Sequence, residues 1–265
     1  MDDRAVATEI GTSARQEEGA PEVRENYLLA GNVRLLQPAN GFRSGLDAVF
    51  LAAAVPAEAG DRVHEAGSGA GAGALCVAAR TNGAQVTGLE IQPQLTTLAK
   101  TNAGLNGFSD RVHFYSGDIT APPQEITSAD PYDHIMMNPP YQERGKARAS
   151  PVRAKHLSRM EENGTLEDWI GYGLGVLKPH GSISIVHRAD RLDDLLACLR
   201  NRAGEIAVFP LWPGEGKAAK RVVLRARKGV RSRLRMLPGM VLHRPDGSYT
   251  EAAQQVLRGL GPLPL

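Results

Sequence analysis

Cysteine is scarce in this chain, which has only Cys76 and Cys198 among its 265 residues. Two thiols provide neither a disulfide framework nor a four-ligand zinc site. Both fall within apolar helical patterns, and because free cysteine is usually buried, we expect both in the core. The histidines do not replace them, because they show no metal-ligand spacing. No metal site is expected, and these residues are interpreted as structural or surface histidines: His64, His134, His156, His180, His187 and His243.

Long apolar runs are also missing. No stretch approaches the ~20 residues that are needed to cross a bilayer, and the polar start lacks the charged-then-apolar layout of a signal peptide. We therefore expect a cytoplasmic protein without a membrane partner. The net charge of +2 is small but unevenly distributed, because residues 217–235 hold nine Lys or Arg and no Asp or Glu. This basic stretch is a candidate for contact with an anionic partner.

The order of local patterns predicts an α/β fold. Residues 1–22 are polar and lack periodicity, which predicts a flexible tail, and residues 23–265 are expected to form a single domain with a basic C-terminal extension. Strands are expected at 61–66, 85–90, 111–115, 132–137, 181–187, 205–211 and 219–227, and helices at 71–80, 92–106, 166–177 and 190–202. Their alternation predicts a doubly wound, mainly parallel sheet of seven strands.

Local signals also mark element ends. Thr165, with Asp168 three residues later, fits an N-terminal capping box, and Pro179-His180-Gly181 fits the punctuation before a strand. The connection from Asn138 to Gly164 is unusually long for a compact domain and is typical of a lid or binding loop. It carries the basic residues Arg144, Lys146, Arg148, Arg153 and Lys155.

A glycine turn follows the strand at 61–66 and leads directly into a helix, which is the context of a nucleotide-binding turn. Glycines permit a tight turn and close approach of a ligand, while N–H groups at a helix start favour an anionic group. Here that group would be the methionine carboxylate of S-adenosylmethionine. The candidate contacts are Glu65, Gly67, Ser68, Gly69 and Gly71.

Acidic residues follow the next two strands. Glu90 stands where a carboxylate accepts hydrogen bonds from ribose hydroxyls, with Ile91 beside it. Asp118 can bind an adenine amino group while Ile119 packs on the ring. Carboxylates at both places suit a cofactor without phosphates, although a nicotinamide dinucleotide could use the same glycines and acid. A simple close turn with a solvated strand end is the remaining alternative.

The strand at 132–137 ends in Asn138-Pro139-Pro140-Tyr141, where doubly wound sheets bind ligands. This pattern suits an amino group whose lone pair is delocalised. Asn138 Oδ1 and the Pro139 carbonyl could accept its two N–H bonds, and the prolines fix the backbone. Tyr141 would stack on a planar substrate. The cofactor supplies the electrophile, so no metal is needed. A rigid turn with a surface-packed ring is the alternative.

These motifs, together with Gly41–Asp47 and Gly247–Ala252, resemble the bacterial tRNA1(Val) (adenine-N6)-methyltransferase family from about residue 25 onward. The resemblance implies a Rossmann-like class I fold, S-adenosyl-L-methionine as cofactor and S-adenosyl-L-homocysteine as product. It implies N6 methylation of an anticodon-loop adenosine in a valine tRNA. It also implies cofactor contacts from Ser44 and Asp47, although Asp47 could equally be the first-turn acid of a helix. The family more often has Asp where Glu65 stands.

Several functions remain open. Guanine N2 of rRNA, adenine N6 of DNA and glutamine N5 of a release factor all present a conjugated amino group, and Asn138 alone cannot separate them. A release-factor enzyme is expected to carry an N-terminal helical domain, for which the start of this chain gives no sign. A second alternative is a non-catalytic RNA-binding module, against which Glu90, Asp118 and Asn138 argue. The oligomeric state is not predicted.

RNA contact is expected from the basic residues of the 138–164 connection and from Lys217, Lys220 and Arg221. The run that begins at Arg221 also alternates basic and apolar residues, as an outer strand would. Part of its charge would then be a solvated face.

Overall fold

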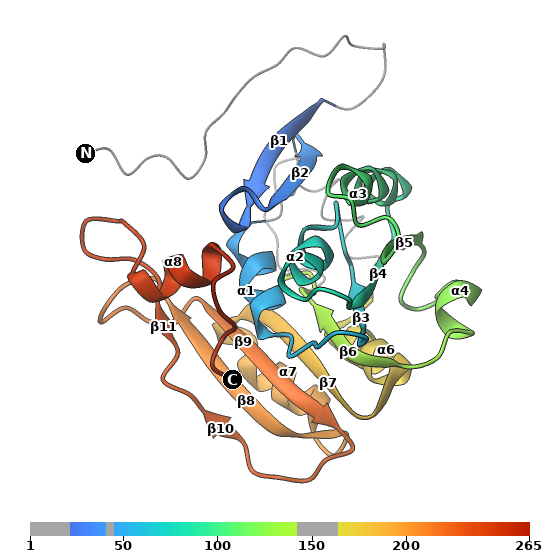
Figure 1. The fold of residues 1–265 in the computed structure, drawn as a ribbon. Helices are drawn as coiled ribbons and strands as arrows, with labels where there is room; N and C mark the ends of the chain where they lie inside the picture. The colour runs from blue at the N-terminus through green and yellow to red at the C-terminus, as the bar shows by residue number, and fades with distance from the viewer. Residues whose placement is uncertain (1–21, 41–44, 142–163) are drawn as a thin grey trace, which may run out of the picture.

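The computed structural model describes residues 22–40, 45–141 and 164–265, and a mixed sheet forms the centre of this part of the chain (Figure 1). Its nine described strands run in the order β10-β8-β9-β7-β6-β3-β4-β5, with β11 also paired to β8. The strands are β3 (Arg62–Ala66), β4 (Gln85–Glu90), β5 (Val112–Ser116), β6 (Tyr132–Met137), β7 (Leu177–Arg188), β8 (Ala203–Trp212), β9 (Arg221–Lys228), β10 (Arg235–Met236) and β11 (Met240–Val241).

Helices cover both faces of this sheet (Figure 1). They are α1 (Leu46–Ala54), α2 (Ala72–Arg80), α3 (Pro93–Leu105), α4 (Gln124–Thr127), α6 (Leu166–Val176), α7 (Leu192–Leu199) and α8 (Glu251–Leu257), with short 3₁₀ turns η1 (Leu29–Gly31) and η2 (Ala189–Arg191). Among the described residues, no helix is both long and apolar enough to pass through a bilayer.

The strand side chains divide the interior into two apolar cores. Met136 points into the core under α1, α2 and α3, whereas its neighbours Ile135 and Met137 point into the core under α6 and α7. Successive side chains of a strand alternate between faces, so a strand buried on both faces is apolar throughout. This is why the run at 132–137 lacks an apolar–polar alternation.

The doubly wound, mainly parallel sheet confirms the fold expected from the sequence. The seven long strands, β3 to β9, lie at the expected places, and two strands of two residues each extend the edge beside β8. β9 runs antiparallel to both β7 and β8. The capping box of α6 is also present, because Thr165 and Asp168 each bond the other's backbone N–H.

Some boundaries differ from the expected ones. β7 begins at Leu177, four residues early, and Pro179-His180-Gly181 forms an irregularity where the register against β6 shifts. The helix expected at 190–202 is split into η2 and the shorter α7. Cys76 is buried, and burial raises the pKa of its thiol to about 12, whereas Cys198 is only half-buried. The expected core position therefore holds fully for Cys76 alone.

An antiparallel hairpin of β1 (Val23–Leu28) and β2 (Val33–Pro38) was not expected from the sequence. Its turn gives little local signal, because Leu29 and Ala30 adopt the left-handed conformation at φ 51° and 56° before Gly31. Left-handed backbone is usually assigned to glycine or asparagine. The hairpin packs against α3, which follows β4 (Figure 1).

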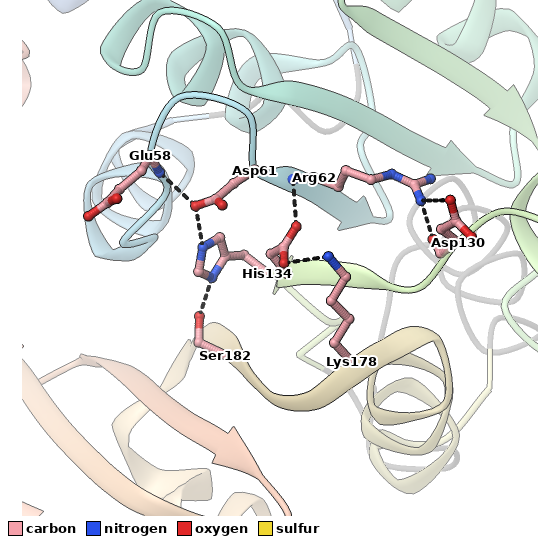
Figure 2. A network of polar contacts seen from close by, with 8 residues as sticks. Glu58, Asp61, Arg62, Asp130, His134, Lys178 and Ser182 are labelled. Atoms are coloured by element: carbon pink, nitrogen blue, oxygen red, sulfur yellow. Dashed lines mark hydrogen bonds and ion pairs between the residues drawn. The ribbon is translucent and has the colours of Figure 1, made fainter.

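Polar side chains join the amino ends of β3, β6 and β7 (Figure 2). The His134 ring lies 3.1 Å from Asp61 Oδ2 and 2.8 Å from Ser182 Oγ. Lys178 Nζ donates to Asp133 Oδ1 over 2.6 Å. This network lies at the edge of the sheet opposite Asn138, so it holds strand ends together and agrees with a structural His134.

Candidate active site

The predicted site residues gather at the carboxyl edge of the sheet. β3, β4, β5 and β6 are parallel neighbours, so their carboxyl ends open onto the same edge. The glycine turn follows β3, Glu90 ends β4, Asp118 follows β5 and Asn138 follows β6. Ligands of doubly wound sheets bind at this edge, where the connections diverge to opposite faces. The topology thus brings together motifs that are up to 71 residues apart (Gly67 to Asn138).

The glycine turn is tied to the end of β4. The backbone N–H groups of Gly67 and Ser68 both donate to the Leu89 carbonyl, over 2.8 and 2.9 Å. Gly69 N donates to Glu90 Oε2 over 2.9 Å. Burial raises the pKa of Glu90, although the backbone N–H bonds that it accepts act in the opposite direction. A carboxylate oxygen has more than one lone pair, so Glu90 can still accept a ribose hydroxyl.

Each of the three glycines of the turn has positive φ, but their surroundings differ. A Cβ added to Gly67 would lie 2.5 Å from the Trp169 ring, and one added to Gly71 would lie 2.7 Å from the Phe114 ring. At Gly69 an added Cβ would meet nothing within 4 Å. The outer glycines are therefore needed for packing against the protein, while the middle one faces open space that a ligand can enter.

The Ser68 side chain, in the same turn, faces the protein interior, where Oγ would lie 2.7 Å from a Cβ added at Gly88. Its hydroxyl is buried, yet within the part of the chain that the structure describes Oγ has no hydrogen-bond partner. Buried polar atoms without partners are rare and call for an explanation. Here Gly88 leaves the space that the hydroxyl occupies beside the Phe114 ring, so the features that fit a ligand with hydroxyl groups are the open turn at Gly69 and the Glu90 carboxylate.

Glu65 points away from the open side of the turn. Its Oε2 accepts from Ala74 N in the first turn of α2 over 2.7 Å, in space left by Gly73. Burial raises the pKa of Glu65 to about 8, with a smaller contribution from the charge of Glu90. Here the carboxyl group caps α2, and its contact with a cofactor stays a prediction.

This burial predicts a pH-dependent stability. Glu65 favours its protonated form in the folded state. Its contribution to the free energy of unfolding is therefore complete below pH 4.5 and is lost as pH rises through about 8. We expect Glu65→Gln to match the wild type near pH 4.5 and to exceed its free energy of unfolding at pH 9 by a few kcal/mol, since each pKa unit corresponds to about 1.4 kcal/mol. Urea denaturation at both pH values measures the difference, and equal curves at pH 9 would contradict the prediction.

The third acidic position forms a local turn. Asp118 Oδ1 accepts from both the backbone N–H and the hydroxyl of Thr120, each over 2.8 Å. Ile119 packs into the core under α6, and Ile91 is half-buried after Glu90. Asp118 is half-buried at the same edge. Its contact with an adenine remains a prediction.

Tyr141 of the Asn138–Tyr141 motif is held by residues from distant segments. Its hydroxyl lies 2.7 Å from Asn138 Oδ1 and 2.8 Å from Asp47 Oδ2. Asp47 stands in the first turn of α1 and also accepts from Arg221 Nε over 3.1 Å. The Arg221 guanidinium lies over the Tyr141 ring, 4.6 Å from its centroid. Asp47 and Arg221, expected at the cofactor and at RNA respectively, therefore both contact Tyr141.

His187 also packs on Tyr141, and sequence reasoning missed it. The two rings meet edge to face with centroids 5.1 Å apart. Burial lowers the pKa of His187 to about 4, helped by the charge of Arg191 and opposed by the Arg188 and Pro140 backbone. The ring is therefore neutral at pH 7. A single histidine inside an apolar strand gave no signal of this place.

Asn102 on α3 is the second residue that sequence reasoning missed. Its Oδ1 accepts from Leu36 N, and its Nδ2 donates to the carbonyls of Leu36 and of Ala70 in the glycine turn, all over 2.8–2.9 Å. Asn106, one helical turn later, makes the matching pair of bonds to the backbone of Arg34. Asn102 alone of these two also reaches the glycine turn. Two asparagines spaced i, i+4 in a helix were the available signal.

The basic stretch is divided between the two ends of β9. Lys217 and Lys220 are exposed in the connection before β9, whose first residue, Arg221, pairs with Arg188 at the carboxyl end of β7. Three later cations bind backbone carbonyls instead: Arg225 those of Ala54 and Leu265, Arg227 that of His180, and Lys228 that of Leu177. Only the start of the stretch therefore faces the site.

Several predicted contacts lie outside the described residues. They are Ser44, Arg144, Lys146, Arg148, Arg153 and Lys155. Within the ranges that the structure describes, no group of three or more His, Cys, Asp or Glu side chains could hold a metal ion.

Comparison with known proteins is consistent with this edge as a methyl-transfer site. The sequence model of the Methyltransferase small domain matches residues 44–192, a range that includes the glycine turn, Glu90, Asp118 and the Asn138–Tyr141 motif. The chain belongs to the methyltransferase small domain family. S-adenosylmethionine is the methyl donor of such class I methyltransferases, and the open Gly69 and the Glu90 carboxylate fit it.

Individual relatives of this chain are also named as methyltransferases. A tRNA1(Val) (adenine(37)-N6)-methyltransferase of Porphyromonas gingivalis is 34% identical over 158 residues, which cover 58% of this chain and only 61% of that protein. A protein of the same name from Aeromonas hydrophila is 28% identical over 210 residues, 78% of this chain and 85% of that protein. The crystal structure of an Agrobacterium tumefaciens protein, described as a predicted O-methyltransferase, has a TM-score of 0.68 at 26% identity and covers 82% of this chain and 97% of that chain.

The methyltransferase's Asn102 offers a test of the link between hairpin and cofactor turn. We expect both Asn102→Ala and Asn106→Ala to lower the melting temperature, because each leaves backbone groups of β2 unpaired. Only Asn102→Ala should also weaken S-adenosylmethionine binding, by about ten-fold, since it alone releases the Ala70 carbonyl. Titration calorimetry on both variants measures this, and equal cofactor affinities would show that Asn102 supports only the hairpin.

Proposed function

We propose that this chain transfers a methyl group from S-adenosylmethionine to the exocyclic N6 of an adenosine in tRNA, in the cytoplasm. The observation that carries the proposal is the placement of Asn138-Pro139-Pro140-Tyr141 at the carboxyl end of β6, next to the open glycine turn after β3. By the family resemblance and the names of the relatives, the finer assignment is the anticodon-loop adenosine of a valine tRNA.

The chemistry follows from the acceptors of the motif. The lone pair of an adenosine amino group is delocalised into the ring, so the nitrogen is a poor nucleophile. Asn138 Oδ1 and the Pro139 carbonyl would accept hydrogen bonds from its two N–H groups and favour a more tetrahedral nitrogen. When bound, S-adenosylmethionine supplies the methyl group on a sulfonium. In that transfer the nitrogen would gain the methyl group as the sulfur–carbon bond broke, with S-adenosylhomocysteine as the product and one N–H proton released to solvent.

An amino group suits this motif better than a hydroxyl. Methylation of a hydroxyl benefits from a base that takes up its proton, and the amide of Asn138 is not such a base. Three described titratable groups lie around the motif: Tyr141, whose pKa burial raises, Asp47, which is bonded to Arg221 and Tyr141, and His187, whose pKa burial lowers to about 4. Hydrogen-bond acceptors at fixed positions are what the nitrogen of a conjugated amino group needs.

The RNA assignment is supported by the relatives and by charge at the same edge. Two exposed cations, Lys217 and Lys220, precede β9 beside Arg221 and Tyr141. Phosphate contacts made by such side chains position a nucleic acid without reading its sequence. Guanine N2 of rRNA, adenine N6 of DNA and glutamine N5 of a release factor remain the alternative acceptors.

The deciding experiment offers each acceptor class to the protein. The purified chain is incubated with labelled S-adenosylmethionine and, separately, tRNA lacking N6-methyladenosine, unmodified rRNA, DNA and a release factor, and products are identified by mass spectrometry. We expect N6-methyladenosine in tRNA. A product in another acceptor, with tRNA unmodified, would overturn the substrate class. Cofactor binding without any product would favour the non-catalytic RNA-binding module.

A further inference from the structure

A chain of hydrogen bonds leads from β9 and α1 to the amide of Asn138. Asp47 Oδ2 accepts from Arg221 Nε over 3.1 Å and lies 2.8 Å from the Tyr141 hydroxyl. The same hydroxyl lies 2.7 Å from the Asn138 side-chain amide, where the structure places Oδ1. All four side chains are half-buried.

The Tyr141 hydroxyl has one proton for two acceptors. Burial and the charge of Asp47 raise its pKa, so the hydroxyl is protonated at pH 7. A carboxylate is a stronger acceptor than an amide oxygen, so the hydroxyl donates its one hydrogen bond to Asp47. The Tyr141 oxygen then has only lone pairs to offer to Asn138. Two oxygens 2.7 Å apart without a proton between them repel, so the branch of the amide that faces Tyr141 must be the N–H group.

We infer that Asp47, acting through the Tyr141 hydroxyl, is a positioning residue that fixes which way the Asn138 amide faces. With Nδ2 donating to Tyr141, Oδ1 occupies the other branch of the amide, turned away from Tyr141. Either branch fits the same space, and hydrogen bonding decides between them. The reverse orientation would present an N–H group to the N–H groups of the target, which cannot accept it. This relay of hydrogen bonds, from Asp47 through Tyr141 to Asn138, therefore selects the amide orientation that amino-group methylation requires.

Arg221 completes the relay from the outside. Its guanidinium pairs with Asp47 Oδ2, the oxygen that accepts the hydrogen bond from the Tyr141 hydroxyl. It also lies over the Tyr141 ring. Burial lowers the pKa of Arg221, but the hydrogen bond and the charge of Asp47 outweigh this and raise it. Asp47 Oδ2 thus accepts hydrogen bonds from both the Arg221 guanidinium and the Tyr141 hydroxyl.

The inference rests on the proposed methylation of an amino group, and isosteric variants test it. Tyr141→Phe keeps the ring for stacking and removes the hydroxyl, while Asp47→Asn replaces the carboxylate by a neutral amide of similar shape. We expect each to lower kcat about ten-fold with the KM for RNA nearly unchanged, since one oriented hydrogen bond is lost. The double variant should be no slower than either single one, because both break the same relay.

Tyr172→Phe is the matched control. It also removes a tyrosine hydroxyl that is hydrogen-bonded inside the fold, here to His64 Nε2 over 2.8 Å, but it lies outside the relay. Its melting temperature should fall, as is expected for Tyr141→Phe, while kcat stays at the wild-type value. A parallel fall of kcat in this control would show that stability loss alone explains the effect and would overturn the inference.

Other outcomes separate the inference from its premises. A wild-type protein that methylates no amino group refutes the proposed function itself. If the wild type is active, unchanged kcat in Asp47→Asn or multiplied losses in the double variant overturn the relay. A weaker S-adenosylmethionine affinity of Asp47→Asn, with normal kcat at saturating cofactor, would instead support the cofactor contact that the family resemblance implied. Calorimetry with S-adenosylmethionine alone provides that readout independently of turnover.

Discussion

Asn138→Ala is expected to lower kcat by roughly 100-fold or more while leaving S-adenosylmethionine affinity within about two-fold of the wild type, as is typical for loss of a preorganised transition-state contact. The variant keeps the backbone carbonyl of Pro139 but loses the side-chain acceptor. Without it, one N–H of the target amino group has no partner, and the lone pair stays delocalised into the ring. Single-turnover methylation of the preferred RNA measures this loss separately from product release.

A fold control accompanies this variant. Asn138 is half-buried at the end of β6, and its side chain bonds Tyr141 rather than the core, so the melting temperature should change little. A variant that folds and binds cofactor yet methylates at the wild-type rate would refute the catalytic role of the motif. That result would leave Asn138–Tyr141 as the rigid turn of the alternative interpretation.

Alanine substitutions at Gly67 and Gly69 are expected to affect different properties, chiefly stability at Gly67 and cofactor binding at Gly69. Both positions are left-handed, at φ 71° and 54°, which costs an alanine about 1–2 kcal/mol. At Gly67 the new Cβ also meets the Trp169 ring at 2.5 Å, and overpacking adds about 1–3 kcal/mol. Gly67→Ala should therefore be the less stable variant in urea denaturation.

Gly69→Ala should instead lose cofactor binding. Its added methyl meets no protein atom within 4 Å and so projects into the open side of the turn. We expect S-adenosylmethionine affinity to fall at least about ten-fold. The loss of stability should be no larger than the cost of a left-handed alanine, about 1–2 kcal/mol. The two variants control for each other. Cofactor affinity that is unchanged in Gly69→Ala would show that the ligand does not approach the middle glycine.

Local signals in the sequence were sufficient for the frame of the site. The glycine turn, Glu90, Asp118 and Asn138 each follow an apolar run, and the parallel order of four strands brings them to one edge. A turn after a strand depends on residues close in the chain, so its type can be inferred from them. The topology that follows is equally constrained, because few arrangements of alternating strands and helices bury every apolar face.

The contacts around Tyr141 could not be predicted in the same way. Asp47 and Arg221 are 174 residues apart, and nothing in either local pattern indicates that they meet. Arg221 was assigned to RNA because it begins a basic stretch, although it is already paired with Asp47 and stacked on Tyr141. Charge counted along a chain does not distinguish a cation that is committed to an internal partner from one that is available to a ligand.

Asn102 in α3 and Asn106, the residue that follows this helix, also protect an edge of the hairpin. β2 pairs with β1 on one side, and on the other its backbone at Arg34 and Leu36 bonds to Asn106 and Asn102. An open strand edge is a template on which another chain can add a strand, and this is a common route to aggregation. Here a helix supplies amide groups in place of a neighbouring strand. The edge is thereby closed without a third strand, and a hairpin that would otherwise invite self-association ends at a helix.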